Sequence, residues 1–178
     1  MMVFEYAKYG NLRDYLKTNF SGLKWSYKLD FLEHIANNLS TIHDQQFVHE
    51  NLHGGNILKF NHDYAKITDF GLAQLYNSES SNSSNIRGVL PYIAPEVLVG
   101  KPFTFASDIY SLGIIMVEMS TGKPTYRSVP HDEKLALAIC NGLRPRVAKG
   151  TPQFYIDLAN RCLDTNPEKR PSLKNYGI

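Results

Sequence analysis

Two stretches of the chain have strong apolar periodicity, and both predict helices. In residues 25–45 the apolar positions recur at steps of three and four, which gives a helix one apolar stripe. That stripe consists of Leu29, Leu32, Ile35, Ala36, Leu39 and Ile42. Residues 105–121 are apolar almost all round, so a helix there is expected to be buried on most sides and to stop at Gly122.

Weaker patterns predict short helices and little sheet. One helix is expected over residues 12–18, capped by Asn11, and one over 96–99, with Pro95 in its first turn. A third is expected over 153–163, capped by Thr151. Two more are expected over 131–141 and 172–178. One apolar strand is expected at 1–7, and a hairpin at 57–60 and 65–68 around a turn at 61–63. Residues 47–56 and the polar stretch 77–85 are expected to be loops. The fold class predicted is mainly α with a small β-hairpin, in one domain over residues 1–178.

Composition excludes several classes of protein. Of the 178 residues, 43% are hydrophobic and 20% charged, which is typical of a globular domain. The formal net charge of +2 is too small to indicate nucleic acid or an anionic membrane as a partner. Cys140 and Cys162 have no paired spacing, so neither a metal site nor a disulfide framework is expected.

Nothing in the chain predicts membrane insertion or export. The first residues lack a basic region followed by a long apolar run, so no signal peptide is expected. The longest apolar run, 109–119, is shorter than the roughly 20 residues that a membrane-spanning helix needs. A cytoplasmic location is therefore predicted.

Five short motifs occur in a fixed order. They are H-E-N-L-H-G-G-N at 49–56, D-F-G at 69–71, A-P-E at 94–96, S-D-I-Y-S-L-G at 107–113 and N-P-E-K-R-P at 166–171. A single D-F-G is a common accident, but this ordered set is specific. The chain resembles the C-terminal lobe of a eukaryotic protein kinase, of tyrosine-kinase-like type, over its whole length. The resemblance implies that the N-terminal lobe is missing except for its last strand and the hinge.

The resemblance implies a nucleotide site that uses ATP and Mg²⁺. Asn56 and Asp69 take the positions of the two metal ligands, since a carboxylate and an amide oxygen suit Mg²⁺. Leu58 takes the position of the adenine floor, and the backbone of Glu5 and Ala7 takes the hinge positions that face adenine. Phe4 takes the gatekeeper position. A protein substrate or protein partner is implied.

Other positions depart from the family pattern. Asn51 stands where the catalytic Asp is expected, and an uncharged amide is not a useful base. Glu50 replaces an Arg that would pair with a phosphate on the activation loop, so a phosphate on Ser78, Ser80, Ser81, Ser83 or Ser84 would not be bound there. His53 and Val89 replace a Lys and a Thr. No G-x-G-x-x-G and no strand lysine occurs in the sequence, so ATP binding is in doubt.

The residues that support the fold are present. By resemblance, Asp108 accepts hydrogen bonds from the backbone near His49, and Glu96 forms a buried ion pair with Arg170. His49 and Phe70 are expected to stack in the core beneath the site. The remaining histidines form no cluster and are expected at the surface; they are His34, His43, His62 and His131.

Three functions stay open at this level. The first is a kinase-like protein impaired in catalysis, which acts as a scaffold through its helices in 105–163. The second is an active protein kinase whose N-terminal lobe is missing from this sequence. The third is a truncated fragment without function, whose exposed apolar face would favour aggregation.

Overall fold

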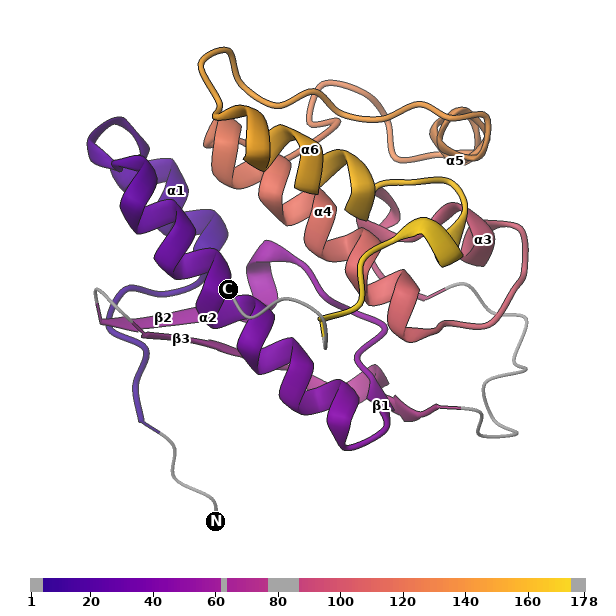
Figure 1. The fold of residues 1–178 in the computed structure, drawn as a ribbon, viewed down its shortest axis with the longest axis horizontal. Helices are drawn as coiled ribbons and strands as arrows, with labels where there is room; N and C mark the ends of the chain where they lie inside the picture. The colour runs from indigo at the N-terminus through magenta and orange to yellow at the C-terminus, as the bar shows by residue number, and fades with distance from the viewer. Residues whose placement is uncertain (1–4, 62–63, 77–86, 174–178) are drawn as a thin grey trace.

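The structure is a computed structural model that describes residues 5–61, 64–76 and 87–173. Helices dominate, as predicted, and the strands are short (Figure 1). The helices are α1 (Leu12–Asn19), α2 (Trp25–Asp44), α3 (Pro95–Leu98), α4 (Phe105–Thr121), α5 (Glu133–Cys140) and α6 (Gln153–Cys162). No helix within these described ranges is both long enough and apolar enough to cross a membrane.

Helix α4 forms the centre of the core. Its N-terminus is closed by a capping box, in which Thr104 and Ser107 bond each other's backbone groups, and it ends at Gly122 in a left-handed conformation. Residues 107–120 are all buried, which confirms the prediction from its apolar surface. Helix α6 packs along α4, and α2 contacts α4 as well (Figure 1).

Helix α2 buries the predicted stripe. Leu32, Ile35, Ala36 and Leu39 are buried, and Leu29 and Ile42 are partly buried against the same core. The helix packs on β3 as well as on α4, so one apolar face joins a helical layer to the small sheet.

In the described part of the chain, four short strands form two antiparallel pairs. The predicted hairpin is present as β2 (Ile57–Asn61) and β3 (Tyr64–Ile67), with Ile57 opposite Ile67. The prediction of a loop at the start of 47–56 is wrong, because β1 (Phe47–Val48) pairs with β4 (Gln74–Leu75). A strand of two residues has no periodicity, and its partner lies far along the chain, so local patterns cannot predict it.

Several predicted boundaries need correction. Thr151 does not cap α6: Pro152 precedes the helix without a side-chain cap, and the Thr151 hydroxyl donates to the Ala148 carbonyl oxygen at 2.7 Å. Helix α5 begins at Glu133 rather than at His131, because the Asp132 carboxylate caps it by accepting from the Lys134 and Leu135 amides.

Some predicted features fall on residues outside the described ranges. These are Phe4, most of the strand 1–7, His62, the serines between 78 and 84 and most of the helix 172–178. The described end of the predicted strand, residues 5–7, has no regular secondary structure.

Candidate functional site

The loop that begins at His49 is fixed by the buried carboxylate of Asp108, in the first turn of α4. Asp108 is 1% exposed. Its Oδ2 accepts from the His49 amide at 2.8 Å, and its Oδ1 accepts from the Glu50 amide at 3.1 Å. The prediction for Asp108 is confirmed, and these bonds satisfy a carboxylate that would otherwise be costly to bury.

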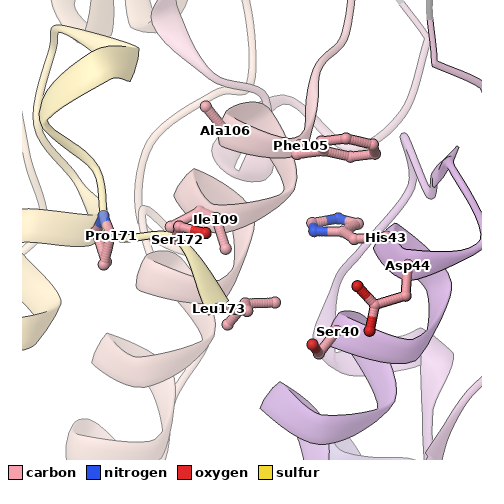
Figure 2. A pocket seen from close by; sticks show the side chains of 9 residues that line it. All are labelled: Ser40, His43, Asp44, Phe105, Ala106, Ile109, Pro171, Ser172 and Leu173. Carbon is pink, nitrogen blue, oxygen red and sulfur yellow. The ribbon is translucent and has the colours of Figure 1, made fainter. Parts of the chain in front are cut away.

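His43 is a further partner of Asp108, and the prediction of a surface position for it is wrong. Its Nε2 lies 2.9 Å from Asp108 Oδ2, and its ring contacts Phe105 with ring centroids 4.6 Å apart. Figure 2 shows His43 between Phe105 and Ser40, beside a cavity of about 140 Å³. His43 lies on the face of α2 that meets the start of α4, a tertiary contact that sequence spacing does not show.

His49 is wholly buried, as predicted, and connects the loop to the end of β3. Its Nδ1 accepts from the Asn51 amide at 3.3 Å, so its Nε2 carries the hydrogen and donates to the Thr68 carbonyl oxygen at 3.1 Å. The His49 and Phe70 rings lie 5.4 Å apart, but Phe70 is 53% exposed. The prediction of a contact is confirmed, and that of a buried Phe70 is wrong, because none of the described elements covers the ring's outer side.

Asn51, Asn56 and Asp69 lie together, and we call them the Asp69 cluster. Asp69 Oδ2 accepts from the Asn51 side-chain amide at 3.2 Å and from the Asn56 side-chain amide at 3.3 Å. The Asn56 amide also donates to the Asn51 carbonyl oxygen at 3.0 Å. Two side chains of the motif at 49–56 therefore converge on one exposed carboxylate oxygen of the motif at 69–71.

Backbone contacts hold the two motifs in register. The Asn56 carbonyl oxygen accepts from the Thr68 amide at 2.8 Å and from the Thr68 hydroxyl at 3.1 Å. Asp69 has φ of +65°, an unusual value for a residue with a side chain, and its Oδ1 accepts from the Gly71 amide at 3.4 Å. The residue with the strained backbone, Asp69, is therefore also the one whose carboxylate accepts from the side-chain amides of Asn51 and Asn56.

The Asp69 cluster has donor atoms that suit a magnesium ion. Asp69 offers a carboxylate, and Asn56 offers its amide oxygen because its nitrogen makes the contacts above. Among the described residues no three His, Cys, Asp or Glu side chains gather into a metal site. A magnesium ion here would need oxygens from a ligand or from water, as is common for this ion.

Two titratable groups of the loop have shifted pKa values. Burial and the nearby Asp108 carboxylate raise the pKa of Glu50 to about 7, although Arg87 opposes the shift. Burial lowers the pKa of His53, and nearby Arg13 lowers it further. His53 Nδ1 accepts from the Gly55 amide at 3.0 Å, so the neutral ring carries its hydrogen on Nε2.

The chain directly after residues 77–86 lies against the loop that begins at His49. A Cβ atom on Gly88 would lie 3.5 Å from the Glu50 carbonyl oxygen and 3.7 Å from Asn51 Oδ1. The Asn51 amide is therefore turned with its nitrogen toward Asp69 and its oxygen toward Gly88. Val89 follows and is partly buried against the core.

A second polar network supports the loop, and sequence analysis missed it. The Tyr92 hydroxyl donates to Glu118 Oε1 at 2.8 Å, and the same oxygen accepts from the Thr125 amide at 3.0 Å. Burial raises the pKa of Glu118. The Tyr92 ring lies 5.6 Å from the His53 ring, which connects this network to the loop. The signal available in the sequence was Glu118, the one charged residue within the apolar run 109–119.

The predicted nucleotide-facing residues are not joined to the Asp69 cluster by any hydrogen bond among the described residues. Glu5 is exposed, and the Ala7 carbonyl oxygen accepts from the Gly10 amide at 3.0 Å. Leu58 lies in β2, partly buried, and forms an isolated bridge with Asn11. The chain from Tyr9 to Asn11 thus runs beside β2.

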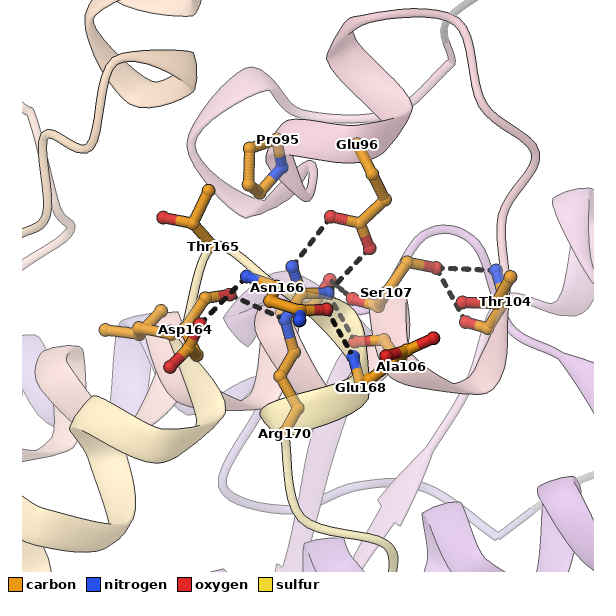
Figure 3. Close-up of polar contacts among 12 residues, drawn as sticks. Pro95, Glu96, Thr104, Ala106, Ser107, Asp164, Thr165, Asn166, Glu168 and Arg170 are labelled. Carbon is orange, nitrogen blue, oxygen red and sulfur yellow. Dashed lines mark hydrogen bonds and ion pairs between the residues drawn. The ribbon is translucent and has the colours of Figure 1, made fainter.

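A buried ion pair joins three parts of the chain that lie far apart in sequence. Arg170 donates to Glu96 through two nitrogens, at 2.6 Å and 2.7 Å, and both residues are buried (Figure 3). Arg170 also donates to the Ala106 carbonyl oxygen at 2.8 Å and the Asp164 carbonyl oxygen at 2.9 Å. The predicted pair is confirmed, and it joins α3, α4 and the segment after α6.

Known proteins match nearly the whole chain. A family model described as protein tyrosine and serine/threonine kinase matches residues 1–176. A probable serine/threonine-protein kinase of Dictyostelium discoideum is 29% identical, over 97% of this chain and 10% of its own length. MDIS1-interacting receptor like kinase 2 of Arabidopsis thaliana is 32% identical, over 97% of this chain and 18% of its own length.

A relative from Drosophila melanogaster, the putative mitogen-activated protein kinase kinase kinase 7-like protein, is 32% identical, over 97% of this chain and 46% of its own length. The chain therefore spans less than half the length of each of these relatives. Since the family model matches almost every residue, the chain belongs to the protein tyrosine and serine/threonine kinase family.

Proposed function

We propose that residues 1–178 are the hinge and C-terminal lobe of a protein kinase domain that is impaired in phosphate transfer. The observation that carries this proposal is the contact between Asn51 and Asp69, whose Nδ2 and Oδ2 atoms lie 3.2 Å apart. The cluster keeps the ligand groups for a metal ion, but the group beside them is an amide and not a carboxylate.

Asn51 is poorly suited to take a proton from a substrate hydroxyl. Its amide oxygen can accept a hydrogen bond, but it carries no charge, and its nitrogen is engaged with Asp69. General-base catalysis typically contributes about 10²–10⁴-fold to a rate. We therefore expect the loop to orient a hydroxyl group while most of the rate is lost.

Asp69 and Asn56 are the residues that would hold Mg²⁺, and the ATP phosphates would complete its coordination. Bound Mg²⁺ neutralises charge on the phosphates and so favours transfer. His53, whose Nε2 carries the hydrogen, would donate a hydrogen bond without adding positive charge. Leu58 and the backbone of Glu5 and Ala7 would contact the adenine.

Regulation by an activation-loop phosphate is not expected at Glu50. Position 50 has no cation to pair with a phosphate, and the buried Asp108 carboxylate lies near it. The names of the relatives favour protein serine or threonine residues as the ancestral substrate. The partner that we expect is a protein, and the two free thiols support a reducing compartment such as the cytoplasm.

A transfer assay tests the proposal. The chain is incubated with Mg²⁺, γ-³²P-labelled ATP and protein acceptors, beside Asp69→Ala and Asn51→Ala variants. We expect no labelling by the wild-type chain above that of Asp69→Ala. Labelling that Asp69→Ala abolishes would overturn the proposal and favour the second candidate, an active serine/threonine kinase.

A further inference from the structure

A groove lies on the side of the molecule that carries the Glu96–Arg170 pair. Its walls come from α3 with the turn that follows it, from the end of α5, and from residues 164–169. Its volume is about 520 Å³, within the range of about 300–1,000 Å³ typical of ligand pockets. Figure 3 shows one part of these walls, with Pro95 of α3 above Thr165. None of the residues of the Asp69 cluster lines this groove.

The groove has more free positive charge than negative. Lys101 and Lys169 are exposed, and neither ammonium group forms an ion pair or a hydrogen bond with a described residue. Glu96 uses both carboxylate oxygens on Arg170, so its charge is neutralised inside the protein. Asp164 is the remaining acid, and its Oδ1 accepts from the Asn166 amide at 2.8 Å.

The neutral polar groups of the groove have hydrogens available to donate. The Thr165 hydroxyl oxygen accepts from Arg144 at 3.0 Å, which leaves the hydroxyl hydrogen for another partner. Asn166 Oδ1 accepts from the Glu168 amide at 3.0 Å, which leaves the Asn166 NH₂ group for another partner. A ligand that accepts hydrogen bonds and carries negative charge would satisfy these groups.

Apolar surface lies beside these donors. Val99, at the end of α3, is 64% exposed, which is high for a large aliphatic side chain in a folded protein. Pro95 and Pro167 lie in the same walls. An apolar side chain placed against Val99 would remove this surface from water, which is favourable.

We propose that this groove binds an acidic segment of a partner protein. Carboxylates of the segment pair with Lys101 and Lys169, and one apolar side chain packs against Val99. A peptide fits better than a nucleic acid, because Asp164 and the apolar wall would oppose a continuous phosphate backbone. The proposal stands apart from the state of the Asp69 cluster, since neither lysine belongs to the loop at His49 or to the turn at Asp69.

The first test measures binding of a defined probe. A fluorescein-labelled peptide with a central leucine flanked by aspartates and glutamates is titrated with the full chain, and its anisotropy is recorded. A peptide with glutamines in place of the acids is the neutral control. We expect the acidic peptide to bind more tightly, and its affinity to fall as salt is raised.

Charge-reversal variants locate the site. We expect Lys101→Glu/Lys169→Glu to weaken binding by at least about tenfold, because the reversed charges repel the peptide. Lys123→Glu/Lys149→Glu changes the net charge equally at exposed positions outside the groove, and we expect little effect. Lys101→Gln/Lys169→Gln removes both positive charges without adding repulsion. It checks that the weaker binding of Lys101→Glu/Lys169→Glu does not come from a folding defect. Equal affinity for the acidic and neutral peptides, or equal loss in the two reversal pairs, would contradict the proposal.

Cys140 gives a second readout from inside the groove. It is partly exposed, whereas Cys162 is buried, and burial raises the pKa of the Cys162 thiol to about 12. Iodoacetamide should therefore alkylate Cys140 first. We expect the acidic peptide to slow this alkylation severalfold in the wild-type chain and not in Lys101→Glu/Lys169→Glu. An unchanged rate in the wild-type chain with peptide bound would place the peptide elsewhere and overturn the proposal.

Discussion

Glu50 is held in an unfavourable setting, both in its backbone and in its side chain. Its φ is +64°, and its amide is bound to Asp108, so the backbone cannot relax without losing that bond. The side chain is half-buried near the Asp108 carboxylate, and its pKa is raised to about 7. The ionised carboxylate is therefore disfavoured in the folded state relative to the unfolded state.

This shift makes the stability of the fold depend on pH. The folded pKa of Glu50 lies above the unfolded value, so ionisation destabilises the fold as pH rises from about 4.5 to about 7. Glu50→Gln keeps the backbone and removes the charge. We expect the variant to be more stable than the wild type at pH 8 by about 1 kcal/mol, allowing for solvent screening, and equal to it below about pH 4, where Glu50 is protonated in both the folded and the unfolded state. Urea unfolding at both pH values measures this, and equal stability at pH 8 would refute it.

Single residues could be predicted from the sequence where a motif fixes their role. Asp108, Glu96 and Arg170 have the contacts expected of them. His43 was predicted wrongly, because its partner is Asp108, which lies on another helix. The convergence of Asn51 and Asn56 on one oxygen of Asp69 depends on the fold of two loops, and spacing alone could not give it.

The helices follow from local signals more completely than the strands do. The bounds of α4 were predicted from an apolar run that stops at Gly122, and the structure adds the cap at Thr104. By contrast, β1 and β4 exist only because two distant dipeptides pair with each other. Local periodicity therefore predicts the elements that bury their own side chains and misses those that depend on a distant backbone partner.

The end of α4 depends on a glycine for two separate reasons. Gly122 has φ of +71°, and a Cβ atom there would lie 2.4 Å from a ring carbon of Phe20. We expect Gly122→Ala to destabilise the fold by about 2–4 kcal/mol, from the backbone strain and the displaced ring together. Thermal unfolding followed by circular dichroism measures this loss.

Gly142 supplies the matched control, because it also follows a helix and has φ of +96°, with no atom within 4 Å of its added Cβ. Gly142→Ala should cost about 1 kcal/mol from the backbone alone. Equal losses in the two variants would show that the Phe20 ring moves freely and that the steric part of the prediction is wrong.

At the scale of the whole molecule, Arg170 ties together parts of the chain that lie far apart in sequence. It contacts Glu96 in α3, Ala106 in α4 and Asp164 after α6. Its guanidinium also lies 5.2 Å from the centre of the Tyr110 ring, whose pKa burial raises to about 12. One side chain therefore joins α3, α4 and the segment after α6.

Replacing Arg170 tests whether the fold depends on this connection as one cooperative unit. Arg170→Met leaves the Glu96 carboxylate buried without its partner, and we expect a loss of about 3–5 kcal/mol. Glu96→Gln/Arg170→Met removes the unpaired charge as well, so the double variant should be more stable than Arg170→Met. Urea unfolding is followed by circular dichroism and by the fluorescence of Trp25, whose ring lies 5.0 Å from that of Tyr155. Since Trp25 lies in α2, coincident midpoints from the two probes would show that breaking the pair destabilises the whole fold. A Trp25 midpoint that stays at the wild-type value would show instead that the pair stabilises its own side of the molecule alone.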